Sequence, residues 1–309
     1  MRIKILLTGG TGLIGKNLNN KLKSKYKLKS IGSEIDLKNE IKVKKLFAEF
    51  KPEILIHLAA KVGGIQANIN DKLGFYKENT LINTNVLKYA EISNVKYIFA
   101  MGTGCAYPKK LEKKILKENN FLDGSPEETN NAYAYAKRNL LIHLQYLHEN
   151  KKIPYCYCIP ANLYGPYDNF HPINSHVIPG LIKKIYNAKI LNKKFHEIWG
   201  TGKAKRDFLF IDDLVNAIDI IVKKRFLGSI NVASGKNTSI KKISKLIAKH
   251  LDYKGKLIFN SKKPEGQLQR KFDTSKMKKL GWKNMHNLSL SIKKTIKWFL
   301  KNQNNLREK

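Results

Sequence analysis

The stretch NAYAYAK (131–137) places Tyr133 four residues before Lys137. On a helix, these two side chains lie on the same face. An ammonium group near a phenol favours the phenolate, so we expect the pKa of Tyr133 to be lowered. Such a pair can pass a proton to a carbonyl oxygen while a nicotinamide delivers hydride to the carbon. Thr103, at the end of an apolar run upstream, can give that oxygen a second hydrogen bond.

A glycine-rich loop near the start of the chain is typical of a site for the nicotinamide cofactor. TGGTGLIG (8–15) contains Gly9, Gly12 and Gly15 and follows an apolar run. The first glycine permits a tight turn, the second lets backbone N–H groups approach a pyrophosphate, and the third lets helix and strand pack closely. A structural turn in another α/β protein is the alternative. A Tyr-x-x-x-Lys pair alone is more often a surface pair, but with this loop and Thr103 it indicates reductase chemistry.

The residues after the second apolar run leave the choice of dinucleotide open. Ser33 could hydrogen-bond a 2′-phosphate, whereas Glu34 would repel one if it pointed inward. The sequence does not place the nearby Lys16. Asp36 and Leu37, slightly further along, are candidate contacts for the adenine.

These residues must be held by the elements between them, and the first half of the chain alternates short apolar runs with amphipathic stretches. The predicted strands are 3–8, 28–32, 54–60, 97–103 and 154–160, and the predicted helices lie near 13–23, 38–50, 72–93 and 131–150. Strands that alternate with helices imply right-handed crossovers and a parallel sheet covered on both faces. The expected fold class is therefore α/β, a Rossmann-type doubly wound sheet with a smaller, mostly C-terminal α/β substrate domain.

The second half is less regular. Residues 164–180, rich in Pro, Asn and His, are predicted to form an ordered loop. Short strands are expected at 230–234 and 256–259, and a basic helix after Ser289. We expect an NAD(P)-binding domain over 1–163 and a substrate domain over 164–309, with a blurred boundary that the chain may recross near 205–235.

The net charge of +35 allows two interpretations. A basic surface is the footprint of nucleic-acid binding, but here lysines are spread over almost every segment and outnumber arginines heavily. We therefore expect no nucleic-acid partner and favour an anionic substrate. No run approaches the ~18 apolar residues of a membrane span. The start MRIKILLTGG resembles a signal peptide, but its apolar run is short and leads into the glycine loop, so we predict a first core strand and a cytoplasmic protein.

The chain has three cysteines, Cys105, Cys156 and Cys158, which form no metal-ligand set. The last two fall in an apolar run and are most simply small core residues of a strand. Cys105 lies in MGTGCAYP (101–108), a loop that directly follows another apolar run. It is either a buried packing residue or part of a site.

The sequence resembles, over nearly its whole length, the extended short-chain dehydrogenases/reductases that act on nucleotide sugars. The resemblance is carried by TGGTGLIG, HLAA (57–60), Tyr133 with Lys137, PANLYGP (160–166) and RDFLFIDDL (206–214). Within that superfamily it is most similar to the GDP-L-fucose synthase family. The distinguishing stretches are AAKVGGI (59–65), GTGCAYP (102–108), NLYGPYDNFHPINSHVIP (162–179) and IWGTG (198–202).

The resemblance implies a role for the cysteine. Members of the family epimerise a GDP-4-keto-6-deoxy sugar at carbons 3 and 5 and then reduce the 4-ketone. Cys105 matches the family's base and His176 its acid, since protons beside a ketone are acidified by the enolate. A packing role for Cys105 and a loop-capping role for His176 are the alternatives. The sugar is a hexose or a heptose, and a homodimer is implied.

The resemblance also implies the binding residues. The cofactor is NADPH, with NADH not excluded, and its contacts are Gly9, Gly12, Leu13, Ile14, Gly15, Ser33, Asp36, Leu37, Ala59, Tyr133, Lys137, Pro160, Asn162, Leu163 and His176. The GDP-sugar contacts are Cys105, Asn162, Lys183, Lys184, Trp199, Arg206 and Arg270. For Lys183, a solvated lysine on a lysine-rich helix is an equal alternative.

The sequence departs from the family pattern at two places, which bear on the epimerase activity and on the choice of cofactor. Thr103-Gly104 replaces the usual Ser-Ser before the cysteine, which could leave a plain 4-reductase without epimerase activity. Thr11 and Gly32 stand near positions where the family commonly places arginines for the NADPH phosphate. A basic binding protein on a Rossmann fold is a third hypothesis, and the intact Thr103, Tyr133 and Lys137 argue against it.

Overall fold

Six parallel strands form the central sheet of the computed structural model, which describes residues 2–111, 114–171, 175–263 and 269–306. The strand order is β10-β6-β4-β3-β1-β2. The strands are β1 (Lys4–Thr8), β2 (Lys27–Ile31), β3 (Ile54–His57), β4 (Tyr97–Met101), β6 (Tyr155–Pro160) and β10 (Gly228–Val232). Every residue of β3, β4 and β6 is buried, as expected for parallel strands covered on both faces.

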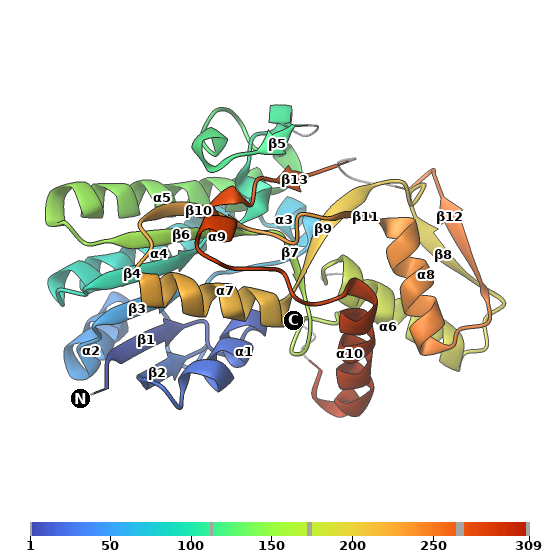
Figure 1. Ribbon diagram of the computed structural model, residues 1–309, viewed down its shortest axis with the longest axis horizontal. Helices are drawn as coiled ribbons and strands as arrows, with labels where there is room; N and C mark the ends of the chain where they lie inside the picture. The colour runs from blue at the N-terminus through green and yellow to red at the C-terminus, as the bar shows by residue number, and fades with distance from the viewer. Residues whose placement is uncertain (1, 112–113, 172–174, 264–268, 307–309) are drawn as a thin grey trace.

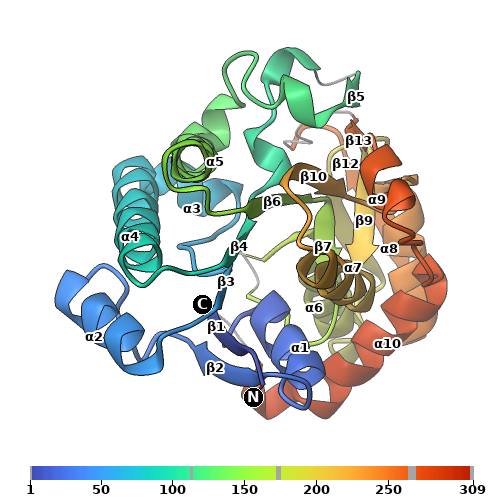
Figure 2. The ribbon, with the colours of Figure 1, turned by 60° about the vertical axis from the view of Figure 1, so that its left-hand side comes forward.

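Helices cover both faces of this sheet. Figure 2 shows α2 (Glu40–Phe50), α4 (Lys72–Ile92) and α5 (Asn131–Lys151) on one face, and α1 (Leu13–Leu22) with α7 (Ile211–Lys224) on the other. Each helix turns an apolar stripe to the sheet, and in α7 this stripe includes Leu214, Ile218 and Ile221, all fully buried. The predicted doubly wound α/β class is confirmed.

The remaining elements form three small sheets and further helices, most of them on the right side of Figure 1, with β5 and β13 at the top of its centre. The sheets have the orders β11-β9-β7, β12-β8 and β13-β5. Their strands are β5 (Ile115–Leu116), β7 (Asn162–Tyr164), β8 (Phe195–Trp199), β9 (Lys205–Phe210), β11 (Asn237–Ser239), β12 (Lys256–Asn260) and β13 (Lys271–Phe272). The helices are α3 (Ile65–Asn70), α6 (Val177–Ile190), α8 (Ile240–Leu251), α9 (Ser275–Lys279) and α10 (Leu288–Lys301).

The chain passes between these two groups of elements more than once. After β7 and β9 it returns through α7 to β10, at the edge of the central sheet. Later, β13 pairs in parallel with β5, about 150 residues earlier in the sequence. A division at 163/164 with a recrossing near 205–235 stays a prediction.

The ends of several elements differ from the expected ranges for physical reasons. The strands expected over 54–60 and 97–103 end at His57 and Met101, because the chain there leaves the sheet to form loops. The loop expected over 164–180 ends early, since α6 begins at Val177. Pro179 lies in the first turn of α6, where its missing N–H costs no helical hydrogen bond. No helix in the described ranges is long and apolar enough to cross a membrane.

Candidate active site

The carboxyl ends of β1, β3, β4 and β6 meet at one edge of the central sheet, and the loops that leave them carry most of the predicted site residues. The glycine loop follows β1, Ala59 follows β3 and Cys105 follows β4. Pro160 ends β6 and Asn162 begins β7. Residues from four separate parts of the sequence therefore converge at this edge.

The glycine loop has the geometry of a dinucleotide-binding turn. Gly9 has φ +75°, and a Cβ on it would lie 2.8 Å from the backbone nitrogen of Ala59. A Cβ on Gly15 would lie 2.2 Å from the Gly9 carbonyl oxygen, so only glycine lets α1 pack on the turn. No side chain caps the first N–H groups of α1, which begins after Gly12 and carries Leu13 and Ile14 in its first turn. Open N–H groups at a helix N-terminus suit a pyrophosphate.

A pocket of about 470 Å³ continues from this loop. Its lining residues are Gly10, Thr11, Lys16, Asn19, Asn20, Ser30, Ile31, Gly32, Glu34 and Tyr167. The Glu34 Oε1 accepts a 2.6 Å hydrogen bond from the Gly32 N–H, and the Lys16 Nζ lies 5.1 Å from the centre of the Tyr167 ring. Ser30 lines the pocket and the predicted Ser33 does not. Ser30 was not predicted, because a serine inside a strand carries no sequence signal of its own.

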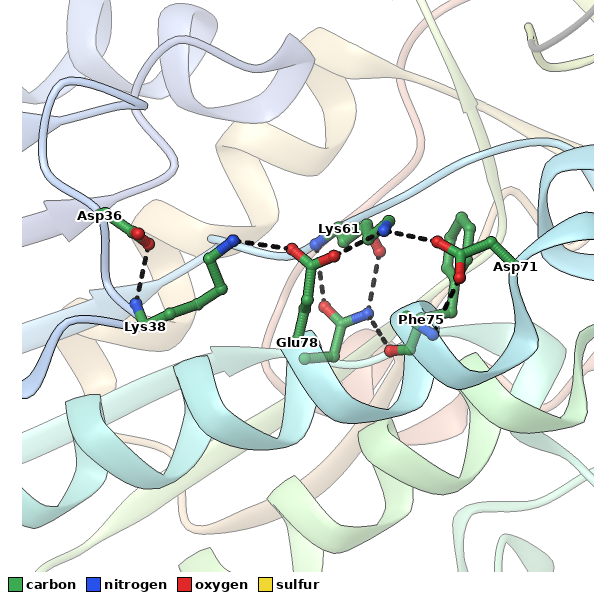
Figure 3. A network of polar contacts seen from close by, with 8 residues as sticks. Asp36, Lys38, Lys61, Asp71, Phe75 and Glu78 are labelled. Atoms are coloured by element: carbon green, nitrogen blue, oxygen red, sulfur yellow. Dashed lines mark hydrogen bonds and ion pairs between the residues drawn. The ribbon is translucent and has the colours of Figure 1, made fainter.

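Asp36 and Leu37, the predicted adenine contacts, take part in local structure. The Asp36 Oδ1 accepts from the Lys38 N–H at 3.0 Å, and the Leu37 side chain is buried in the core. Figure 3 shows the ion-pair network beside them, in which Glu78 bridges Lys38 and Lys61 at 3.0 and 2.6 Å. Asp71 binds the Lys61 Nζ from its other side at 2.7 Å.

This network fixes the loop that carries Ala59. The buried Asn79 accepts from the Lys61 N–H at 2.8 Å and donates to the Lys61 carbonyl oxygen at 3.0 Å. Hydrogen bonds to Asp71 and Glu78 raise the pKa of Lys61, so the ammonium keeps its charge. Because α4 supplies both Asn79 and Glu78, the Ala59 loop is tied to that helix.

A buried polar relay runs behind the same loop. The Thr8 Oγ1 lies 2.8 Å from the His57 Nδ1, and the His57 Nε2 lies 3.1 Å from the Asn83 Oδ1. The Asn83 Nδ2 then donates to the carbonyl oxygen of Ala136 on α5 at 3.2 Å. Burial, and then the charge of Lys137, lower the pKa of His57 to about 4, so this imidazole is neutral.

Tyr133 and Lys137 lie together on α5, but the expected effect on the phenol is wrong. The Lys137 Nζ donates a 2.8 Å hydrogen bond to the Met101 carbonyl oxygen and lies 5.8 Å from the centre of the Tyr133 ring. Burial raises the pKa of Tyr133 well above its ordinary value, and burial lowers that of Lys137 to about 8. Burial disfavours the charged phenolate, so Tyr133 holds its proton near neutral pH.

Cys105 lies on a short turn after β4 that Thr103 and Phe272 shape. The Thr103 Oγ1 accepts from the Cys105 N–H at 3.2 Å. A Cβ on Gly104 would come within 2.6 Å of the Phe272 ring, which accounts for glycine at this position. Burial alone would raise the pKa of the Cys105 thiol, but the Arg270 guanidinium, with smaller contributions from Thr103 and His176, lowers it overall.

His176 occupies the N-cap position of α6 and faces the same site. Its positive charge makes a small contribution to lowering the pKa of the Cys105 thiol. The His176 side chain is 59% exposed, and its Nδ1 lies 4.0 Å from the Oδ1 of the buried Asp168. Asp168 lies in the same loop and was not predicted, because nothing in its spacing or neighbours marks it.

Asn162 and Trp199 are two of the predicted GDP-sugar contacts. The Asn162 Nδ2 donates to the Asp207 carbonyl oxygen at 3.1 Å, which fixes the amide beside β9. Trp199, 58% exposed, has the Nζ atoms of Lys184 and Lys263 at 5.7 and 5.8 Å from its ring. Lys263 was not predicted, because it is one lysine among many.

Three further predicted site residues are Lys183, Arg206 and Leu163. The Lys183 Nζ lies 5.9 Å from the centre of the Phe299 ring on α10, and the Arg206 Nη1 donates to the Lys205 carbonyl oxygen at 2.9 Å. Leu163 is half-buried on β7. Within the described residues, no group of His, Cys, Asp and Glu could hold a metal ion.

Comparisons with known proteins agree with this geometry. Residues 5–233 match the model of the NAD dependent epimerase/dehydratase family. The chain is 38% identical to the GDP-L-colitose synthase of Yersinia pseudotuberculosis, over 98% of this chain and 100% of that protein. A GDP-L-fucose synthetase from Naegleria fowleri bound to NADP has a TM-score of 0.89 at 30% identity, covering 99% of this chain and 96% of that one. A GDP-mannoheptose C4 reductase from Campylobacter jejuni with NADP bound has a TM-score of 0.87 at 29% identity, covering 97% and 98%.

Proposed function

The chain belongs to the NAD dependent epimerase/dehydratase family, and we propose that it is an NADPH-dependent epimerase-reductase of a GDP-4-keto-6-deoxy sugar. The sugar is a hexose or a heptose. One observation supports the proposal: Cys105 and the Tyr133–Lys137 pair meet where β4 ends, and the charge of His176 also acts on Cys105. Two kinds of chemistry on one ketone need both pairs within one site.

The first pair performs the epimerisations. Cys105, as a thiolate, takes the proton from carbon 3, and the electron pair left behind moves into the ketone to give an enolate. His176, as an imidazolium, returns a proton to the opposite face of the same carbon. Cys105 is then a thiol and His176 a neutral imidazole, so both exchange protons with solvent before carbon 5 reacts in the same way.

The second pair performs the reduction. When bound, the nicotinamide supplies the hydride that reduces carbon 4. Tyr133 gives its proton to the ketone oxygen, which suits a phenol whose raised pKa keeps it protonated near neutral pH. Lys137 supplies positive charge near the forming phenolate, and Thr103 donates a second hydrogen bond to the ketone oxygen.

The described residues fit a dinucleotide. The uncapped N-terminus of α1 and the glycine turn would hold the pyrophosphate, with Ala59 packed against that turn. The pocket beyond carries both a cation, Lys16, and a carboxylate, Glu34. Relatives with NADP bound support NADPH as the cofactor.

We assign the GDP moiety to residues of β8, α6 and β9. Trp199 offers an aromatic face to a base, and Lys184 and Arg206 offer cations to a diphosphate. The names of the relatives support a GDP-sugar. Exposed apolar residues on α4 and α5, among them Leu73 and Tyr146, support a homodimer through these two helices.

Deuterium incorporation tests the proposal. The protein is incubated with GDP-4-keto-6-deoxymannose in deuterated water without reduced cofactor, and the sugar is analysed by mass spectrometry and NMR. We expect deuterium at carbons 3 and 5 in the wild type and none in Cys105→Ser. Turnover on addition of NADPH without any deuterium at these carbons would instead assign a plain 4-reductase and contradict the epimerase part.

A further inference from the structure

The guanidinium of Arg270 lies against the turn that carries Cys105. Its Nη1 donates a 3.1 Å hydrogen bond to the carbonyl oxygen of Gly104, the residue before the cysteine. The positive charge of the guanidinium also lowers the pKa of the Cys105 thiol. The resemblance alone placed Arg270 among the contacts of the GDP-sugar, whereas these contacts direct it to the reacting base.

The strand that follows Arg270 holds it in place. In β13, Lys271 and Phe272 pair with Ile115 and Leu116 of β5. Phe272 is 4% exposed, and its ring lies so close to Gly104 that a Cβ there would clash with it. The backbone of Arg270 therefore cannot move away from the cysteine turn without removing a buried aromatic ring from the core.

A buried asparagine, Asn231, links the segment after the cysteine turn to the segments of β5 and β13. The Asn231 Nδ2 donates to the carbonyl oxygens of Leu116 and Asp273 at 2.9 and 3.1 Å, and its Oδ1 accepts from the Tyr107 hydroxyl at 2.8 Å. Asn231 is fully buried on β10. Tyr107 follows the cysteine turn and Asp273 follows Phe272, so one side chain fixes both segments to the central sheet.

We propose that Arg270 is a positioning residue that maintains Cys105 as a thiolate, ready to act as the base. The use of that thiolate on a sugar rests on the proposed function, but its formation does not. A guanidinium stays charged at every working pH, and a fixed positive charge beside a thiol favours the thiolate. An ordinary thiol is mostly protonated near neutral pH, so a base without such a partner would be largely inactive.

The other titratable groups that face the thiol do not replace this charge. His176 favours the thiolate only while it is protonated, and its imidazolium is consumed when it acts as the acid. Tyr133 is neutral near neutral pH because burial raises its pKa. Arg270 is the group in this set whose charge survives the whole reaction.

Alkylation of Cys105 by iodoacetamide as a function of pH tests the proposal without any substrate. Only the thiolate reacts with iodoacetamide. Cys156 and Cys158 are fully buried and burial raises their thiol pKa values, so they are not alkylated in the folded protein. Mass spectrometry of the Cys105 peptide gives the rate. We expect a wild-type midpoint below that of an ordinary thiol. In Arg270→Gln the midpoint rises, and the rate near neutral pH falls about tenfold or more.

Two variants serve as controls. Arg270→Lys keeps the positive charge without the planar fork, so its midpoint falls between those of the wild type and Arg270→Gln. Arg225→Gln makes the same change in net charge near Tyr97, at the opposite end of β4, and leaves the midpoint unchanged. Deuterium exchange at carbons 3 and 5 falls together with the alkylation rate in Arg270→Gln.

Three outcomes decide the matter. A wild-type midpoint at or above that of an ordinary thiol overturns the proposal, even if Arg270→Gln does not fold. An unchanged midpoint in a folded Arg270→Gln that loses affinity for the GDP-sugar assigns Arg270 to the diphosphate and also overturns it. A raised midpoint in this variant, in a protein whose wild type exchanges no deuterium, supports the role of Arg270 and refutes the proposed epimerisation.

Discussion

The Lys137 Nζ lies 2.8 Å from the Met101 carbonyl oxygen and 5.8 Å from the centre of the Tyr133 ring. The ammonium is thus shared between the end of β4 and the face of the tyrosine. The hydrogen bond of Lys137 goes to the Met101 carbonyl oxygen and not to the Tyr133 hydroxyl. It therefore does not offset the cost of burying a phenolate. Burial therefore keeps the phenol protonated, which is the state needed to give a proton to a ketone.

Replacing Tyr133 by phenylalanine separates the two activities. The variant loses the proton donor for the ketone oxygen, so we expect reduction by NADPH to fall about 10²- to 10⁴-fold. Cys105 and His176 are untouched, and deuterium exchange at carbons 3 and 5 stays measurable. Absorbance at the nicotinamide band and NMR of the sugar follow the two reactions. Loss of both in a well-folded variant would contradict this division of labour.

The reduction step has an alkaline limit set by Lys137. Burial lowers the pKa of this ammonium to about 8, so its charge is lost as the pH rises through that value. We expect kcat for reduction to decline there, since the forming phenolate then lacks its counter-charge. Lys137→Arg, whose guanidinium does not titrate, moves the decline to higher pH. A pH profile measured with stopped-flow absorbance would contradict the assignment if wild type and variant shared the same alkaline limb.

Much of the fold was predictable because its signals are local. Alternating apolar runs and amphipathic stretches place the strands, and TGGTGLIG marks the first turn. The pairing of β5 with β13 was not predictable, because each strand has two residues and the partners lie far apart in the sequence. The packing of Phe272 against Gly104, which depends on that pairing, could not be foreseen either.

The candidate site shows the same limit. The positions of Tyr133 and Lys137 on one helix follow from their spacing, but the direction of the phenol pKa does not. That direction depends on how much water reaches the ring, which is set by the packing of α3, α4 and the loops around it. The hydrogen bond from Arg270 to the Gly104 carbonyl oxygen could not be foreseen, because the sequence shows a residue's type and not its neighbours.

Gly104→Ser, which restores the residue type usual in the resembled family, should destabilise this chain. The added Cβ would meet the Phe272 ring at 2.6 Å, so we expect the free energy of unfolding to fall by about 1–3 kcal/mol. Phe272→Leu in the same chain makes room and recovers part of the loss. Urea unfolding of the two single variants and the double variant gives the coupling. Additive effects would show that the two residues do not compete for space.

The buried imidazole of His57 makes stability depend on pH. Its pKa is about 4 in the folded chain and near 6.5 when exposed, so the unfolded state binds more protons between these values. Stability from this group is complete above pH 6.5 and is lost as the pH falls toward 4, up to about 3 kcal/mol. In His57→Gln, which cannot titrate, the slope of unfolding free energy against pH is smaller over this window. Denaturant unfolding at several pH values measures both slopes, and equal slopes would refute the assignment.

The carboxylate of Glu34 should weaken the binding of NADPH relative to NADH. It lines the pocket next to the glycine loop, where a 2′-phosphate would meet its negative charge. In Glu34→Gln the side-chain oxygen can still accept the hydrogen bond from the Gly32 N–H, so the loop keeps its shape. We expect KM for NADPH to fall about three- to tenfold while KM for NADH changes little.

A matched control for this variant is Glu49→Gln on α2, which removes the same charge from an exposed position. It should leave both Michaelis constants unchanged, because screening reduces the effect of distant surface charges. Equal improvement for NADPH in both variants would mean that net charge alone acts. An unchanged KM for NADPH in Glu34→Gln would place the 2′-phosphate away from this carboxylate, with Lys16 then free to bind it from the other wall of the pocket.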